Sequence, residues 1–489
     1  MASESIQEVG ARWSRSAGLT TSAVLRFWLP LATSWLLMAT ENLTVNAIIA
    51  RMAEARLQLA ALGIAFSLAL AVESPIISLL TASNALARDR ESFRLLHRFM
   101  LGLNAAVTMG MLLLGLTPLF DFAVVQLIGA PAEIAVKVRP VLWSLILWPA
   151  AIGFRRFHQG LMIRHGYTRQ IGYGTALRLF TAVGVSLAGL AWGKLDGATV
   201  GGLALGASAI AESVYVWYVA QPLVQKVKGT DTLAERSPLT PSLNPPPPSI
   251  PPTLGGRGAG KGGEGSSLTL RDLLRFYAPL ALTSAITLST APLINSGLAR
   301  SPYPIESLAA WPVVSGQLFA VRSFGLSLQE VVVALLDGPS ALKTLRRFAT
   351  MVGIGSLALL LTIAFTPLAP WWQQRIAGLS EDLTVFAVAA LRLAVLLPVL
   401  AVVVNMLRGI VVTGKATSAI AQATVLNLLA LTSVLLIGGK LGLLPGVSLA
   451  AVALTVSQLA ESAWLWRGAR PTQQRLWEQA RIEALTPLE

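Results

Sequence analysis

The residues of this chain best suited to chemistry are charged side chains inside long apolar stretches. Arg178, Arg322 and Arg392 each lie within such a stretch, and Arg155 and Arg156 end another. A charge at mid-bilayer costs about 2.5–3.5 kcal/mol unless it faces a cavity or a partner. Because a guanidinium group fits carboxylate and phosphate oxygens, we predict an anion site from these candidates: Arg155, Arg156, His158, Arg322, Arg392, Asn405 and Arg408.

Carboxylates in similar stretches could serve as ion-binding sites. Glu41 lies beside Asn42 and Asn46, and this group could bind a proton or a cation. The alternative is that Glu41 is a hydrogen-bonded glutamate near the outer leaflet of the membrane, at the interface with water. We predict Glu41, Asn46 and Glu73 as the proton- or ion-coupling residues. The remaining carboxylates of this kind are expected to tie helices together or to pair with arginines: Glu212, Glu330 and Glu461.

Several function classes are disfavoured by missing patterns. The sequence has no phosphate-binding glycine loop, no nucleophile elbow, no HExxH and no metal-ligand spacing, so we expect no enzyme, cofactor or metal. It has no cysteine, which excludes disulfides and thiol chemistry. Basic and aromatic residues are not interleaved, which argues against nucleic acid as a partner.

The elements that must position these residues are membrane-spanning helices. The chain is 54% hydrophobic and only 13% charged, too apolar for a soluble globular protein. Apolar runs long enough to cross about 30 Å of hydrocarbon as helix predict an all-α polytopic membrane protein with twelve spans: 24–48, 59–83, 97–119, 138–156, 170–192, 197–220, 274–298, 306–336, 345–369, 384–407, 416–438 and 442–466.

The two halves of the chain repeat each other at a shift of 249 positions. "LRFWLPLA" at Leu25–Ala32 returns as "LRFYAPLA" at Leu274–Ala281, and Pro149 and Gly160 land on Pro398 and Gly409. Six spans per half give both halves the same orientation, so we predict two lobes related by an axis along the membrane normal. Two-lobed repeats of this kind are typical of transporters that rock about a central site.

The repeat pairs Glu73 with Arg322, which carry opposite charges. If both line the central cleft, they could form a gate or bind a charged substrate; each could also be satisfied within its own lobe. Glu41 pairs with Thr290, so a coupling site there would belong to the first lobe alone. Pro149 and Pro398, another pair, are expected to loosen their helices, as hinges or as ordinary kinks.

The distribution of positive charge along the chain predicts how the protein is oriented in the membrane. Most arginines and lysines fall on one side of the twelve spans, which places both termini in the cytoplasm, here of a bacterial inner membrane. The same rule alone could explain the basic cluster at 155–164, and the net charge of +14 favours contact with anionic lipids.

We predict a monomer with these parts: cytoplasmic segment 1–23, N-lobe 24–220, cytoplasmic Pro/Gly-rich linker 221–273, C-lobe 274–466 and cytoplasmic segment 467–489, with a surface helix at 470–489.

The quoted segments resemble the progressive ankylosis protein family within the MATE-like flippase superfamily. The resemblance covers most of residues 22–465 and includes "WPAAIGFRRFHQGLMIRHGY" and "LRLAVLLPV". It implies the export of organic and phosphorylated anions such as nucleotides, pyrophosphate and citrate. Glu73 and Arg322 do not match the family's pattern, the basic residue near Arg408 is shifted by one helical turn, and the proline linker is longer.

We therefore expect a secondary active transporter that exports an organic or phosphorylated anion by alternating access, coupled to protons or sodium. A flippase for a lipid-linked oligosaccharide and a cation-coupled multidrug exporter are alternatives on the same scaffold. A third is a membrane scaffold that recruits partners through the proline-rich linker, which otherwise serves as a plain tether.

Overall fold

The computed structural model describes residues 19–165, 167–229, 268–414 and 416–485, and every regular element among them is a helix. Within this part of the chain, ten helices are long and apolar enough to cross a membrane, or up to twelve if each of two bent pairs is one span. Each predicted span corresponds to one of these helices or bent pairs. Most of the predicted linker and the start of segment 1–23 lie outside the described residues.

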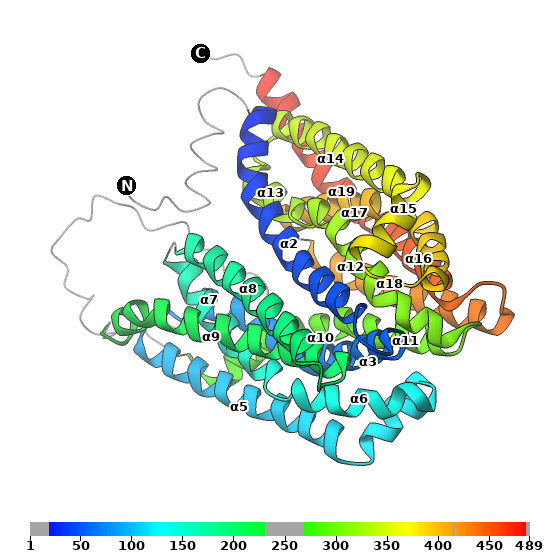
Figure 1. The fold of residues 1–489 in the computed structure, drawn as a ribbon. Coiled ribbons are helices and arrows are strands. Elements are labelled where there is room, and N and C mark those ends of the chain that lie inside the picture. The colour runs from blue at the N-terminus through cyan, green and yellow to red at the C-terminus, as the bar shows by residue number, and fades with distance from the viewer. Residues whose placement is uncertain (1–18, 166, 230–267, 415, 486–489) are drawn as a thin grey trace.

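The N-terminal lobe holds the first six spans (Figure 1). Its second span is interrupted by a short 3₁₀ turn and its fourth by a bend, while a π-helix connects the third to the fourth. The elements are α2 (Thr21–Ile49), α3 (Ala55–Glu73) with η1 (Ser74–Ser78) and α4 (Leu79–Leu86), α5 (Arg90–Leu116), η2 (Asp121–Ile128), α6 (Ala132–Ser144) with α7 (Trp148–Arg164), α8 (Thr168–Trp192) and α9 (Gly197–Gly229).

The C-terminal lobe repeats this order. Its elements are α10 (Leu270–Leu288) with α11 (Thr290–Ala299), α12 (Pro304–Leu326) with α13 (Leu328–Leu335), α14 (Pro339–Phe365), α15 (Leu368–Trp371) with the π-helix η4 (Trp372–Ile376), α16 (Glu381–Leu393) with α17 (Leu397–Thr413), α18 (Thr417–Leu441) and α19 (Gly446–Leu485). Since α19 continues through Pro471 to Leu485, the described part of the helix predicted at 470–489 extends the last helix and does not begin a separate one.

The boundaries of the helices confirm the internal repeat. α5 begins at Arg90 and ends at Leu116, and α14 begins and ends 249 positions later, at Pro339 and Phe365. The same shift relates both ends of α8 to those of α18, and both ends of α7 to those of α17. Two copies of one six-helix unit therefore fold in the same way, although few of their side chains are identical.

Proline marks both bends. α6 meets α7 at 42°, and α16 meets α17 at 44°. Pro149 and Pro398 lie in the first turn of the second helix of each pair. A proline has no N–H to donate to the carbonyl four residues before it, so the helix loses a bond at the bend. Pro30 and Pro279, by contrast, lie inside the unbroken helices α2 and α10.

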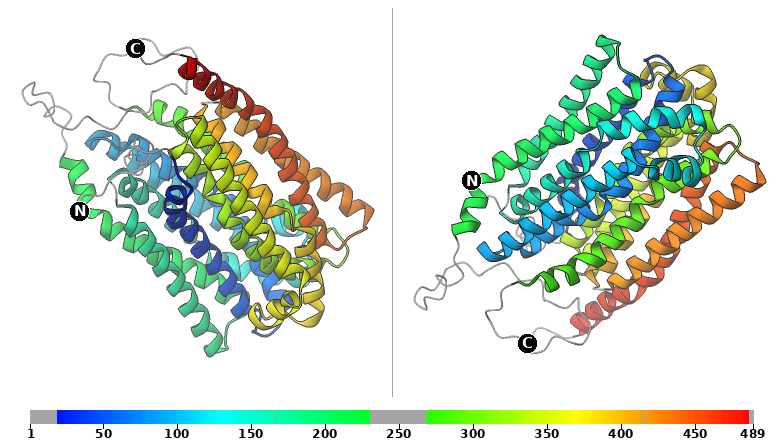
Figure 2. Two further views of the ribbon diagram at one scale, coloured as in Figure 1. Left: turned by 90° about the horizontal axis from the view of Figure 1, so that it is seen from above. Right: turned by 90° about the horizontal axis from the view of Figure 1, so that it is seen from below.

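The long helices of both lobes run along one bundle (Figure 2). The apolar core differs between the two ends of this bundle. We call the end where α2 and α10 begin the linker end, and the other, where α2 stops before Arg51, the Arg51 end. At the Arg51 end one continuous core joins both lobes, from Ile49 and Leu62 to Leu298 and Val314. At the linker end each lobe has a separate core. Among the described residues, a core shared by both lobes is thus found at the Arg51 end and not at the linker end.

The first helix of each lobe crosses to the other lobe at the linker end. Trp28 of α2 packs in the C-lobe core and its Nε1 donates to the Phe324 carbonyl at 3.0 Å. Tyr277 of α10, the repeat equivalent of Trp28, packs in the N-lobe core and its hydroxyl donates to the Pro75 carbonyl. These exchanged helices line the space left between the lobes.

Candidate functional site

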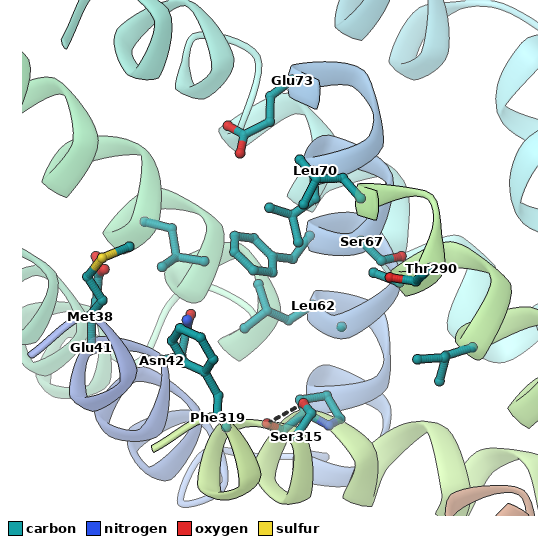
Figure 3. A pocket seen from close by; sticks show the side chains of 18 of the residues that line it. Met38, Glu41, Asn42, Leu62, Ser67, Leu70, Glu73, Thr290, Ser315 and Phe319 are labelled. Atoms are coloured by element: carbon teal, nitrogen blue, oxygen red, sulfur yellow. Dashed lines mark hydrogen bonds between the residues drawn. The ribbon is translucent and has the colours of Figure 1, made fainter. Parts of the chain in front are cut away.

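A cavity of about 650 Å³ lies between the two lobes. Its wall is largely apolar, with Leu62, Leu70 and Phe319 among the lining side chains, and the polar groups come from a few helices (Figure 3). Glu41 and Asn42 reach it from α2, Glu73 from the end of α3, and Thr290 from α11. An apolar chamber with a few convergent polar groups is the usual form of a ligand site.

Two of the cavity's arginines are neutralised by carboxylates of their own lobe. Arg178 lies 2.7 Å from a carboxylate oxygen of Glu41, and Ser208 donates to the same glutamate at 2.8 Å. Arg155 pairs with Glu212, which also lies 3.8 Å from Arg178. Glu41 is only 2% exposed and already paired, so it ties α2 to α8 and α9.

Three charged groups of the cavity have no such partner. Glu73, Arg156 and Arg322 form no ion pair within the described residues, and one side-chain atom of each is buried without a hydrogen-bond partner there. Glu73 is 4% exposed, whereas both arginines keep some accessible surface. Arg322 belongs to the C-lobe and the other two to the N-lobe. Unpaired charges in a low-dielectric chamber attract a complementary ligand strongly.

Four predicted site residues lie away from this cavity. Arg392, predicted to belong to the anion site, is exposed at the end of α16, where its Nε donates to the Ala364 carbonyl at 3.1 Å. Arg408 pairs with Glu461. The others are buried within their lobes, His158 between the rings of Phe154 and Phe157, and Asn405 with its amide on the Ala401 carbonyl.

Two of the three remaining carboxylates tie helices together as predicted. Glu212 receives Gln159 and two arginines, while Glu461, its repeat equivalent, receives Arg408 and Asn427. Glu330 differs, because it is exposed near the start of α13 and has no ion pair within the described residues. Each lobe therefore has one buried carboxylate that joins its fourth, fifth and sixth spans.

The sequence contained a signal for one further part of the cavity wall. Thr283, Thr287 and Thr290 share one face of the seventh span and line the cavity, together with Ser284. Each threonine hydroxyl donates to a backbone carbonyl of its own span, at 2.7–2.9 Å. The hydroxyl oxygens can still accept hydrogen bonds. Their spacing of four and three residues could have revealed this face.

The floor of the cavity is formed by two equivalent asparagines. Asn46 Nδ2 donates to the Pro312 carbonyl at 3.1 Å, and Asn295 Nδ2 donates to the Gly63 carbonyl at 3.2 Å. Asn46 and Asn295 are repeat equivalents, and so are Gly63 and Pro312. Each bond joins one lobe to the other, so the amide of Asn46, predicted to bind a coupling ion, holds the lobes together here.

Comparison with known proteins supplies the name of the architecture. No family model and no curated protein matches the sequence. Solved structures do: the inward-facing conformation of a multidrug resistance MATE family transporter of the MOP superfamily gives a TM-score of 0.60 at 13% identity, over 94% of this chain and 99% of that one. The chain has the MATE fold.

Two other structures with this fold extend the comparison. A MOP superfamily transporter from Pyrococcus furiosus gives a TM-score of 0.60 at 16% identity, over 97% of this chain and 98% of that one. The lipid II flippase MurJ, in an inward closed conformation, gives a TM-score of 0.60 at 12% identity, over 94% of this chain and 93% of that one. These MATE-fold proteins are transporters and a flippase, not enzymes, and this chain is likewise an integral, multi-pass membrane protein.

Proposed function

We propose that this protein is a secondary active transporter that moves an organic or phosphorylated anion by alternating access. One observation carries the proposal: Arg156 and Arg322 reach the same cavity from opposite lobes, and neither has an ion-pair partner within the described residues. A guanidinium pair of this kind suits a substrate with two anionic groups or one phosphate. Because the two arginines belong to different lobes, a bound anion would also link the lobes.

Glu73 is the proposed coupling group. It is the carboxylate of the cavity without an ion pair, whereas Glu41 is held by Arg178 and Ser208. A buried carboxylate that can bind a proton or sodium ion next to an anion site would couple the two fluxes. Binding of the cation would offset the charge on Glu73 while the anion offsets those on the arginines.

The separation of the cores supports alternating access. The lobes share a core at the Arg51 end and have separate cores at the linker end. If the linker end is cytoplasmic, as the basic residues predict, the protein is in an inward-facing state.

The narrower proposals retained from the sequence are a progressive-ankylosis-type anion exporter, a bacterial inner membrane location, cytoplasmic termini, a monomer and the stated lobe boundaries.

A lipid-linked flippase is the second candidate, because the cavity wall is mostly apolar and MurJ shares the fold. The multidrug alternative relies on cavity carboxylates, and of the two that line this cavity Glu41 is already paired with Arg178. The Pyrococcus transporter of this fold has a binding pocket of reverse polarity, so this fold accommodates pockets of different polarity.

Uptake by proteoliposomes tests the proposal. Purified protein would be supplied with labelled ATP, pyrophosphate or citrate, with and without imposed proton and sodium gradients. We expect saturable movement of at least one anion, stimulated by one gradient. If none of the anions moves under any gradient while a fluorescent lipid-linked phosphate is flipped, the anion proposal is wrong and the flippase takes its place.

A further inference from the structure

A second hollow lies on the outer surface of the C-lobe, at the linker end. It measures about 560 Å³, within the range of ligand pockets of roughly 300–1,000 Å³. α17 forms its floor with Val402, Val403 and Met406, while α14 and Trp466 of α19 form its sides. We call this the α14–α19 groove. It is separate from the central cavity, with which it shares no lining residue.

The internal repeat explains why the groove exists. Positions 403, 406 and 407 carry valine, methionine and leucine, and their equivalents in the N-lobe are Phe154, Phe157 and His158. There the rings fill the space: Phe154 and His158 lie 4.3 Å apart between centroids, and Phe157 and His158 lie 5.2 Å apart. In the C-lobe, Val403 and Met406 are smaller than the equivalent phenylalanines and leave this space open.

One end of the groove is basic and the rest is apolar. Arg346 lines the linker end, where its Nη2 donates to Gln473 at 2.7 Å, and Arg470 stacks on Trp466 with its guanidinium 3.9 Å from the ring. Towards the middle of the bundle the lining is apolar, with Ile354, Leu357 and Val399. Within a membrane this polarity fits a molecule with an anionic head and a hydrocarbon tail.

We infer that the α14–α19 groove binds an anionic phospholipid. One acyl chain would fill the space between α14 and α19, restoring the dispersion contacts that an empty hollow lacks. The lipid phosphate would lie at the Arg346 guanidinium, and Arg470, stacked on the lining residue Trp466, would add positive charge near this end of the groove. Because the other face of α17 packs on α12, which carries Arg322, the lipid would support the wall of the transport site from behind.

Native mass spectrometry of the purified protein tests this site. The protein would be titrated with phosphatidylglycerol and, separately, with phosphatidylcholine. We expect phosphatidylglycerol to bind at least tenfold more tightly. Filling the groove in the manner of the N-lobe, with Val403→Phe and Met406→Phe, should abolish that preference, and Arg346→Gln should weaken it severalfold. Arg347→Gln, which removes the neighbouring charge outside the groove, should have no effect.

Three outcomes would overturn the inference. One is equal phosphatidylglycerol binding by wild type, the filled variant and Arg346→Gln. Another is that Arg347→Gln weakens phosphatidylglycerol binding as much as Arg346→Gln does, which would indicate a diffuse effect of surface charge. The third is competition by glycerol phosphate without acyl chains, which would identify a site for free anions. If the filled variant does not fold, Leu357→Phe, which intrudes from the wall on α14, provides a second blocked groove.

Discussion

Arg51 and Arg300 occupy the same position in the two repeats, and each closes the end of a helix in the opposite lobe. The Arg51 Nη2 donates to the carbonyls of Arg375 at 2.7 Å and Ile376 at 3.1 Å. The Arg300 Nη2 donates to the equivalent carbonyls, of Gln126 and Leu127, both at 2.8 Å. Carbonyls at a helix C-terminus carry partial negative charge, which favours a cation there.

We call these two arginine contacts, of Arg51 and Arg300, the latches. Glycine leaves the space that each arginine side chain occupies. Gly129 and Gly378 follow the π-helices with φ of +80° and +77°, a left-handed conformation that side chains rarely adopt. A Cβ at Gly378 would lie 2.8 Å from Arg51, and one at Gly129 would lie 3.3 Å from Arg300. The two equivalent contacts close the lobes at the Arg51 end.

Removing both latches should open the Arg51 end more often. Hydrogen bonds to charged groups contribute about 1.5–3 kcal/mol, and the exposure of both arginines puts each latch at the lower end. The chain has no cysteine, so Ser315→Cys in the cavity wall provides a clean reporter. We expect a membrane-impermeant thiol reagent, added on the Arg51 side, to label it several times faster in Arg51→Ala/Arg300→Ala.

The matched control is Arg56→Ala, which removes an exposed arginine that pairs with Glu306 and Asp382 at the same end. An exposed pair contributes about 0–1 kcal/mol, so labelling should change little. Unchanged labelling in the double variant, or an equal increase in Arg56→Ala, would show that the latches do not hold this end closed.

Breaking the buried pair of Glu41 and Arg178 should destabilise the protein strongly. Removal of one partner leaves a buried charge uncompensated, at a cost of about 3–5 kcal/mol. Thermal unfolding in detergent should therefore show a large drop in Tm for Arg178→Met, and a smaller drop for Glu41→Met/Arg178→Met. Lys137→Met, at an exposed pair with Glu54, serves as the control. A double variant as unstable as the single one would argue against the pairing.

Glu73→Gln should uncouple transport without abolishing substrate binding. The amide keeps the size of the side chain but cannot take up a proton or bind sodium as a carboxylate does. In proteoliposomes we expect anion exchange to continue while stimulation by the imposed gradient is lost. If Glu73→Gln keeps full stimulation and Glu41→Gln loses it, the coupling group has been assigned to the wrong glutamate.

The fold could be derived from the sequence because hydropathy and the repeat are one-dimensional signals. Span lengths follow from apolar runs, and the shift of 249 positions relates the bounds of α8 to those of α18. Pro149 and Pro398 marked the two bends for the same reason. A chain this apolar has few ways to satisfy its backbone in a bilayer other than helices.

The site was harder to predict from the sequence than the fold. Hydropathy indicates the depth of a residue in the membrane but not the direction in which its side chain points. Arg392 lies inside an apolar run, yet it faces outward in the last turn of α16 against Phe365. Its repeat equivalent, Trp143, makes the same tie, donating to the Gly115 carbonyl at 3.1 Å. Which arginines are neutralised, such as Arg178 by Glu41, depends on contacts between helices 137 residues apart in sequence.

The comparison of Arg322→Gln with Arg392→Gln in anion uptake tests the central claim most directly. Both substitutions remove one arginine from the C-lobe, but only Arg322 lines the cavity. For the anion that the wild type transports, we predict that Arg322→Gln lowers uptake at least tenfold, with a raised KM, while Arg392→Gln stays within twofold of wild type. Equal uptake by both variants would contradict an anion site between the lobes.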